Sequence, residues 1–153
     1  MCWMCDNPEA TFEDCLEDYL DDVVRPVVAR LGHAIQATDR HGAPVAYTVG
    51  LAARGQAELV VTGKPPDDAH DLIEAVLAGE EVPTAGRRCD LLRGPALWAF
   101  AVTRPETLQV AVALTPGLTA LQLVWADSLG RWPWEVHRSS QRLLFDLGRA
   151  WAA

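Results

Sequence analysis

The hydrophobic and polar positions between residues 11 and 31 follow a helical period. Apolar side chains recur at steps of three and four residues and form one stripe: Phe12, Cys15, Leu16, Tyr19, Leu20, Val23, Val24, Val27, Val28 and Leu31. Thr11 stands at the N-cap position of this helix, with Asp14 at the spacing of a capping box. Pro26 lies inside the pattern, so we expect it to kink the helix or to end its first part, and we expect Gly32 to end the second.

The pattern after this helix changes to the alternation of β-strands. Residues 33–38 and 45–49 are predicted strands, joined by a turn over residues 39–44 that contains glycine and proline. Residues 57–62 are more continuously apolar, which is typical of a central strand. Two prolines followed by two acids open a second helix over residues 65–79.

The second half of the chain continues this mixture of elements. The predicted strands cover residues 87–92, 96–102 and 118–125, and the predicted helices cover residues 108–114 and 141–151. We therefore expect one α+β domain over residues 1–153, with a single mixed or antiparallel sheet of about five to seven strands backed by about three to four helices. Within it, residues 1–10 would form a cysteine-containing arm and residues 135–153 a helical tail.

The charge and the apolar runs of the chain limit the partners and the cellular location that we expect. The net charge is −8, and residues 1–75 carry 14 acidic against 5 basic side chains. Acidic surfaces repel phosphate backbones, and the arginines form no stripe, so we expect no nucleic-acid partner. No apolar run is long enough to span a membrane, and the N-terminus carries acids where a signal peptide carries positive charge. We therefore expect a cytoplasmic protein without a membrane partner, and both a monomer and a homodimer remain open.

Cys2 and Cys5 are separated by two residues in a chain that has only 4 cysteines. This spacing suits two thiolates on one zinc or iron ion, or a thiol redox couple. A metal site would need further ligands, and no second close pair of cysteines or histidines is present. A third interpretation is that the two sulfur side chains and Trp3 anchor the N-terminal arm. The sequence has no phosphate loop or dinucleotide fingerprint, so no nucleotide cofactor is expected.

Polar residues interrupt the predicted strands at positions where apolar ones are usual. Tyr47 and Thr48 lie in the second strand, Glu58 begins the third, and Gln122 lies in the strand before Trp125. A buried polar side chain without a partner costs about 1–3 kcal/mol, so these residues predict a shared polar pocket, with exposed edge positions as the alternative. Trp125, Trp132 and Trp134 surround Asp127 and Arg131 in the sequence, which indicates either an aromatic wall for an organic ligand or core packing.

Five segments of the chain resemble the bacterial family catalogued as domain of unknown function 4262. They occur in the family's order and are residues 1–6, 46–51, 58–63, 121–127 and 130–134. The resemblance implies that these positions correspond to the family's motif positions: Cys2, Cys5, Tyr47, Thr48, Gly50, Glu58, Gln122, Trp125, Asp127 and Trp134. It implies no particular activity. Two segments depart from the family pattern, namely Gln56-Ala57, where a proline is frequent before the glutamate, and the tail at residues 142–145, which lacks a proline-containing, glycine-ended segment.

The favoured prediction is that this small protein binds a small organic molecule. If the protein is an enzyme, it would also transform that molecule. The pocket would be lined by Tyr47, Thr48, Glu58, Gln122, Trp125, Asp127 and Trp134. Glu58 or Asp127 would be the general acid or base of any reaction, because a partly desolvated carboxylate can be tuned towards neutral pH. The competing predictions are a zinc, iron or thiol-redox protein that uses Cys2 and Cys5, and a non-catalytic interaction module.

Overall fold

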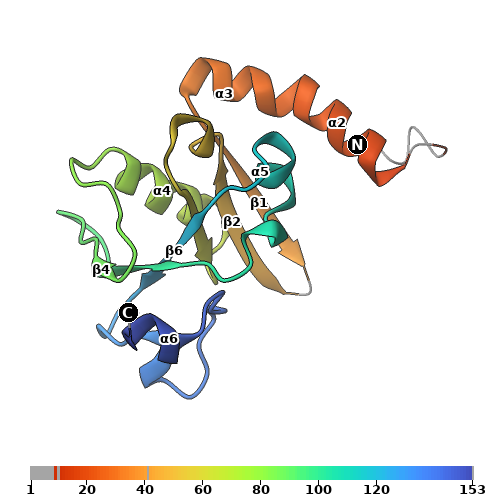
Figure 1. The fold of residues 1–153 in the computed structure, drawn as a ribbon. Helices are drawn as coiled ribbons and strands as arrows, with labels where there is room; N and C mark the ends of the chain where they lie inside the picture. The colour runs from red at the N-terminus through yellow and green to blue at the C-terminus, as the bar shows by residue number, and fades with distance from the viewer. Residues whose placement is uncertain (1–8, 10, 41, 153) are drawn as a thin grey trace.

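The computed structural model describes residue 9, residues 11–40 and residues 42–152. Its centre is a mixed six-stranded sheet with the order β1-β2-β3-β6-β5-β4 (Figure 1). The strands are β1 (Ala34–Arg40), β2 (Ala43–Val49), β3 (Glu58–Thr62), β4 (Arg87–Arg88), β5 (Leu97–Ala101) and β6 (Ala120–Trp125). All neighbours are antiparallel except β3 and β6, which run parallel in the middle of the sheet. The predicted α+β class with one mixed sheet is therefore confirmed.

Helices cover both faces of this sheet. They are α2 (Phe12–Tyr19), α3 (Arg25–Leu31), α4 (Pro66–Leu77), α5 (Gln109–Leu114) and α6 (Leu147–Ala152). Because side chains alternate along a strand, Ala46 of β2 faces a core that includes Ile73 of α4, while Tyr47 faces a second core that includes Val110 of α5. The sheet is thus buried on both sides, which explains its continuously apolar central strands.

The N-terminal helix begins as the sequence predicts. The Thr11 side chain accepts a hydrogen bond from the Asp14 N–H, and the Asp14 carboxylate accepts from the Thr11 N–H, which completes the capping box. Gly32 ends the helical region in the left-handed conformation, with φ of 85°. Pro26 does not end the helix, because a π-helical turn over Leu20–Val24 widens the backbone directly before it.

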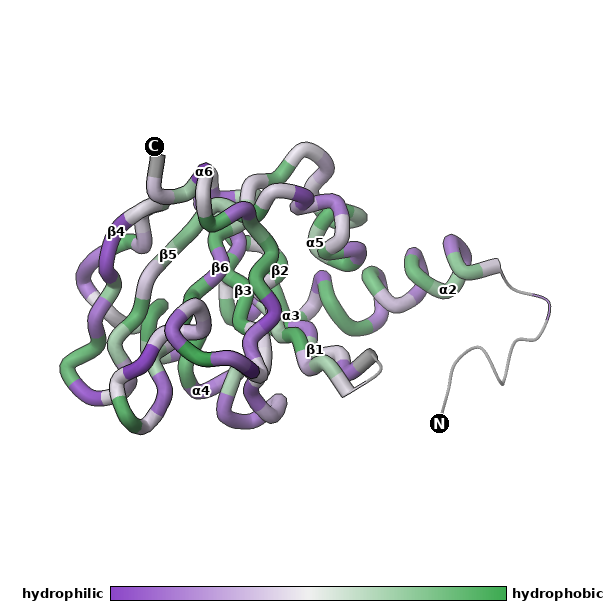
Figure 2. Tube along the Cα trace, turned by 90° about the horizontal axis from the view of Figure 1, so that it is seen from below, coloured by the Kyte–Doolittle hydropathy of each residue, from purple (hydrophilic) through white to green (hydrophobic). Residues whose placement is uncertain are grey.

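The helix α2 projects beyond the sheet (Figures 1 and 2). None of its residues is buried, and Phe12 near its start is 52% exposed. Packing begins only further along, where Leu20 and Val24 join the core beneath. Among the described residues, no helix combines the length and the apolar character that crossing a bilayer requires.

Two segments differ from the sequence-based expectation. Residues 141–146, expected in a helix, are non-helical, and only α6 at the end of the tail is helical. The backbone of residues 141–146 instead forms hydrogen bonds with the side chain of Gln122 on β6. The strand expected over residues 87–92 is limited to β4, since the Asp90 carboxylate accepts the Leu97 N–H at 3.1 Å and replaces a backbone carbonyl there.

Candidate functional site

Thr48 and Glu58 form a fully buried polar cluster at the ends of β2 and β3. The Thr48 hydroxyl donates to Glu58 Oε2 at 2.5 Å and accepts from the Leu59 N–H at 2.8 Å. Glu58 Oε1 accepts the N–H groups of Gly50 at 2.9 Å and of Ala52 at 3.0 Å. Both side chains are 0% exposed, so the cluster clamps the loop after β2 and faces no solvent.

Gln122 lies on β6 and holds the C-terminal segment. Its amide nitrogen donates to Thr62 Oγ1 at 3.1 Å and to the Arg142 carbonyl at 2.8 Å. Its amide oxygen accepts the Leu144 N–H at 2.7 Å. Gln122 is 0% exposed, and these contacts account for its burial in the sheet.

Tyr47 faces the side of the sheet opposite to Thr48. Its hydroxyl accepts the Val110 N–H at 3.3 Å, and its ring packs in the core beneath α5. It also lines a cavity of about 350 Å³ together with Leu108 and Arg142. The structure therefore brings Thr48 and Glu58 together but separates Tyr47 and Gln122 from them.

Trp125 and Asp127 belong to a different pocket, formed where the chain leaves β6. The pocket has a volume of about 330 Å³. Trp125, Trp132 and Pro133 provide apolar and aromatic walls, and residues 136–140 form a further side. The Asp127–Arg131 ion pair also belongs to the lining, so this pocket combines the aromatic and charged groups that the sequence placed close together.

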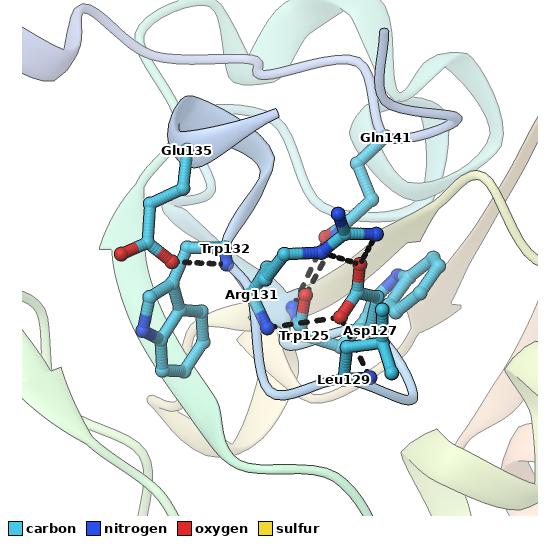
Figure 3. A network of polar contacts seen from close by, with 7 residues as sticks. All are labelled: Trp125, Asp127, Leu129, Arg131, Trp132, Glu135 and Gln141. Atoms are coloured by element: carbon cyan, nitrogen blue, oxygen red, sulfur yellow. Dashed lines mark hydrogen bonds and ion pairs between the residues drawn. The ribbon is translucent and has the colours of Figure 1, made fainter. Parts of the chain in front are cut away.

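The Asp127 carboxylate is held by its own turn (Figure 3). Oδ1 accepts the N–H groups of Leu129 and Arg131, both at 2.9 Å, and Oδ2 accepts the Nε–H of Arg131 at 2.9 Å. A terminal guanidinium nitrogen of Arg131 also forms an ion pair with Oδ2 at 2.9 Å. The hydrogen bond from the Arg131 backbone is the main cause that lowers the pKa of Asp127 below its ordinary value, and the guanidinium and the Leu129 N–H act in the same direction against partial desolvation. Asp127 is therefore ionised at neutral pH and neutralised locally by Arg131.

The pocket is fixed to the sheet by contacts of Trp125. The Gln141 side chain accepts the Trp125 N–H at 3.0 Å and donates to the Trp125 carbonyl at 2.7 Å, as Figure 3 shows. The indole Nε1 donates to the Thr62 carbonyl at 3.0 Å. A cation also lies over the indole ring, since Lys64 Nζ is 4.1 Å from its centroid. These contacts preorganise the aromatic wall before any ligand binds.

Gly63, directly after β3, lies against the backbone of Ser140, which lines the pocket. Its φ is +80°, and a Cβ atom at this position would lie 2.5 Å from the Ser140 carbonyl oxygen. Only glycine allows this close approach of two backbones. The residue therefore positions the segment that carries Arg138, Ser139 and Ser140 along the pocket.

Trp134 is placed in an aromatic cluster beside the pocket. It stacks on Trp132 with a centroid distance of 5.5 Å, and it makes edge contacts with Phe100 at 6.3 Å and with Trp151 at 5.7 Å. Phe145 in turn stacks on Phe100 at 4.7 Å. Trp134 thus supports the pocket wall from behind through Trp132.

Cys2 and Cys5 lie outside the described residues. Within the part of the chain that the structure describes, no group of three or more His, Cys, Asp and Glu side chains is arranged to hold a metal ion. Cys15 and Cys89 are both free thiols. Burial, reinforced by the nearby Glu81 and Asp90 carboxylates, raises the pKa of Cys89, so this thiol is protonated and unreactive at neutral pH.

The sequence patterns did not identify several residues that line the pocket. His137, Arg138, Ser139 and Ser140 lay within the expected helical tail. Lys64, which contacts the Trp125 ring beside the lining, gave no signal because it follows a strand as an ordinary turn residue. The local signal that was available is the Trp-Pro-Trp run after the turn at Asp127. Its proline and its two tryptophans indicate a rigid, aromatic segment that continues past the strand.

The fold and the pocket define a small α+β domain with a preformed aromatic and charged surface pocket. The chain belongs to the family described as "Domain of unknown function (DUF4262)", whose model matches residues 27–139. The match contains the pocket residues from Trp125 to Ser139 and excludes Cys2, Cys5 and the segment from residue 140 onwards. Neither the curated proteins nor the solved structures contain a match to this chain.

Proposed function

We propose that this protein binds a small organic molecule in the pocket lined by Trp125, Asp127 and Trp132. The observation that carries the proposal is the combination of a concave site of about 330 Å³ with two indole walls and an oriented ion pair. Pockets that bind small molecules characteristically pair apolar walls with a few fixed polar groups. The position of this pocket within the family-matched region supports the same conclusion.

Binding, rather than turnover, is the function that these side chains favour. Glu58 is enclosed by three donors and does not line this pocket, so it has no path to a ligand there. Three hydrogen bonds and the Arg131 ion pair hold the Asp127 carboxylate, and a carboxylate with a lowered pKa is a weak general base. Its geometry instead suits a positioning role, in which the carboxylate fixes the Arg131 guanidinium at the pocket. The free thiols Cys15 and Cys89 fit a reducing compartment, which supports a cytoplasmic location as part of the proposal.

The proposal can be tested with isotope-labelled protein and a fragment library of neutral and charged aromatic compounds. We expect bound fragments to shift the indole N–H signals of Trp125 and Trp132 and the backbone signals of residues 136–140 in NMR spectra. The variant His137→Trp would fill the pocket from an exposed position of its lining and abolish these shifts. Ser128→Trp, on the exposed turn outside the pocket lining, is the matched control and should bind like the native chain. Fragments that bind elsewhere, or bind His137→Trp unchanged, would overturn the proposal.

A further inference from the structure

The charges around this pocket differ in sign from the chain as a whole. The protein carries a net charge of −8, yet its pocket lining contains two arginines, Arg131 and Arg138, and one carboxylate, Asp127. Asp127 and Arg131 neutralise each other through their ion pair. The remaining carboxylate of this segment, Glu135, is bound by the Trp132 N–H at 2.7 Å and is not part of the pocket lining. The positive charge of Arg138 is therefore left uncompensated at the pocket.

Lys64 is not part of the pocket lining, but it adds a second cation beside the pocket through its contact with Trp125. Its ammonium lies over the Trp125 ring, which is itself a wall of the pocket. Lys64 is half-buried, although no carboxylate lies within 4.0 Å of its ammonium or of the Arg138 guanidinium in the described part of the chain. A partly desolvated ammonium without a counter-charge is unfavourable, and the indole face compensates only in part.

The hydroxyl groups of the pocket point to the same ligand chemistry. Ser139 Oγ accepts the Gln141 N–H at 3.1 Å, which leaves the Ser139 hydroxyl proton available for donation. Ser140 lies next to it along the pocket. Two hydroxyl donors beside two cations match the acceptor oxygens of a carboxylate or phosphate group.

Resting on the proposed function, we propose that the ligand is a small organic anion. Its carboxylate or phosphate group is recognised by Lys64 and Arg138, and its apolar, preferably aromatic part lies against the indole rings of Trp125 and Trp132. The charge excess selects the acid over its neutral amide, and the indole walls select an organic acid over an inorganic ion. Asp127 contributes by keeping Arg131 oriented, which disfavours a competing cationic ligand.

The test compares matched ligands that differ only in charge. Native protein is titrated with 4-hydroxybenzoate, 4-hydroxybenzamide and inorganic phosphate, and binding is followed by the NMR signals of Trp125 and Trp132. We expect the acid to bind about tenfold or more tightly than the amide, and we expect phosphate to compete with the acid. Raising the ionic strength should weaken binding of the acid and leave binding of the amide unchanged.

Two variants test whether Lys64 and Arg138 cause the preference for the acid over the amide. Lys64→Met and Arg138→Gln should each weaken binding of the acid by about threefold to fivefold, as expected for partly exposed charge pairs, and should leave the amide unaffected. Arg30→Gln, which removes an exposed arginine on α3, is the control and should have no effect. If the amide binds at the pocket as tightly as the acid, the anion preference is overturned while the small-molecule pocket stands. If neither these compounds nor any library fragment binds there, both proposals fail together.

Discussion

Gln122 and Gln141 hold the same two segments together by reciprocal contacts. The Gln122 side chain extends from β6 to the backbone of Arg142 and Leu144, and the Gln141 side chain extends from the C-terminal segment to both backbone groups of Trp125. β3 pairs with β6 only as far as Gln122, so the Gln141 amide takes the place of a further strand. The pocket wall at residues 136–140 is thereby tied to the sheet.

Replacing Gln141 by leucine should destabilise the protein by about 2 kcal/mol. The change leaves the N–H and the carbonyl of Trp125 without their partners in a partly buried position. Chemical denaturation measures the loss, with Gln109→Leu on the exposed side of α5 as the control. The combined Gln122→Leu and Gln141→Leu variant should lose less than the sum of the single losses, because both residues hold one segment. Fully additive losses would contradict this arrangement.

Substitutions at Glu58 should lower the stability of the fold and should not act directly on ligand binding. Glu58→Gln replaces one acceptor oxygen by an amide nitrogen that cannot accept from these donors and should cost about 1–2 kcal/mol, whereas Glu58→Leu leaves the Gly50 and Ala52 N–H groups unpaired and should cost about 3 kcal/mol or more. Thermal and denaturant unfolding measure both values. Glu17→Gln on exposed α2 serves as the control. An unchanged melting temperature in the two Glu58 variants would show that the cluster does not clamp the loop.

Gly63→Ala should both destabilise the fold and weaken ligand binding. Alanine at a φ of +80° costs about 1 kcal/mol or more, and its Cβ would also displace the Ser140 backbone. Gly117→Ala separates the two effects, because Gly117 has a φ of +77° but nothing within 4 Å of the added Cβ. Calorimetry should therefore show a larger loss at position 63 than at position 117. Equal losses would mean that the close approach to Ser140 does not matter.

The Asp127 turn should make stability depend on pH in the acid range. The folded-state pKa of Asp127 lies below its ordinary value, so its stabilising contribution is complete above roughly pH 4 and is lost as the pH falls through the lowered pKa. The melting temperature of Asp127→Asn should lie below that of the native chain at neutral pH, and the difference should shrink in acid. Asp18→Asn, at an exposed position of α2, is the reference and should show no such trend. A difference that stays constant down to acid pH would exclude this carboxylate as the cause.

The metal hypothesis for Cys2 and Cys5 makes its own prediction. Protein purified without a histidine tag should contain stoichiometric zinc or iron, and the Cys2→Ser, Cys5→Ser double variant should lose it. Glu17→Gln, at an exposed position of α2 that carries no thiol, should keep the metal. Elemental analysis of the three proteins is sufficient, and native protein without metal would remove this hypothesis.

The sequence predicted those elements whose determinants are local. The apolar stripe and the Thr11 cap located the N-terminal helix, alternation located β2, and apolar runs located β3 and β6. It did not predict the non-helical segment at residues 141–146. That conformation depends on contacts with Gln122 and Trp125, which are distant in sequence, whereas the leucine spacing alone favoured a helix.

The candidate site shows the same division between local and distant determinants. Tyr47 and Thr48 are adjacent on one strand and must face opposite sides of the sheet, so strand geometry alone indicates that they do not share a pocket. Trp125, Asp127 and Arg131 were found together because one tight turn carries them. Lys64 and Arg138 come from segments that only the folded chain brings to the same place, and no spacing in the sequence signals their proximity.

The parallel pairing of β3 with β6 makes the two halves of the chain dependent on each other for folding. Each strand completes the hydrogen bonding of the other at the centre of the sheet, and the intervening chain supplies the helix α4 and β5, the antiparallel partner of β6. A nascent chain released before β6 would present β3 as an open, apolar edge that invites aggregation. Such non-local pairing also slows folding. The core can therefore form only after β6 has been synthesised.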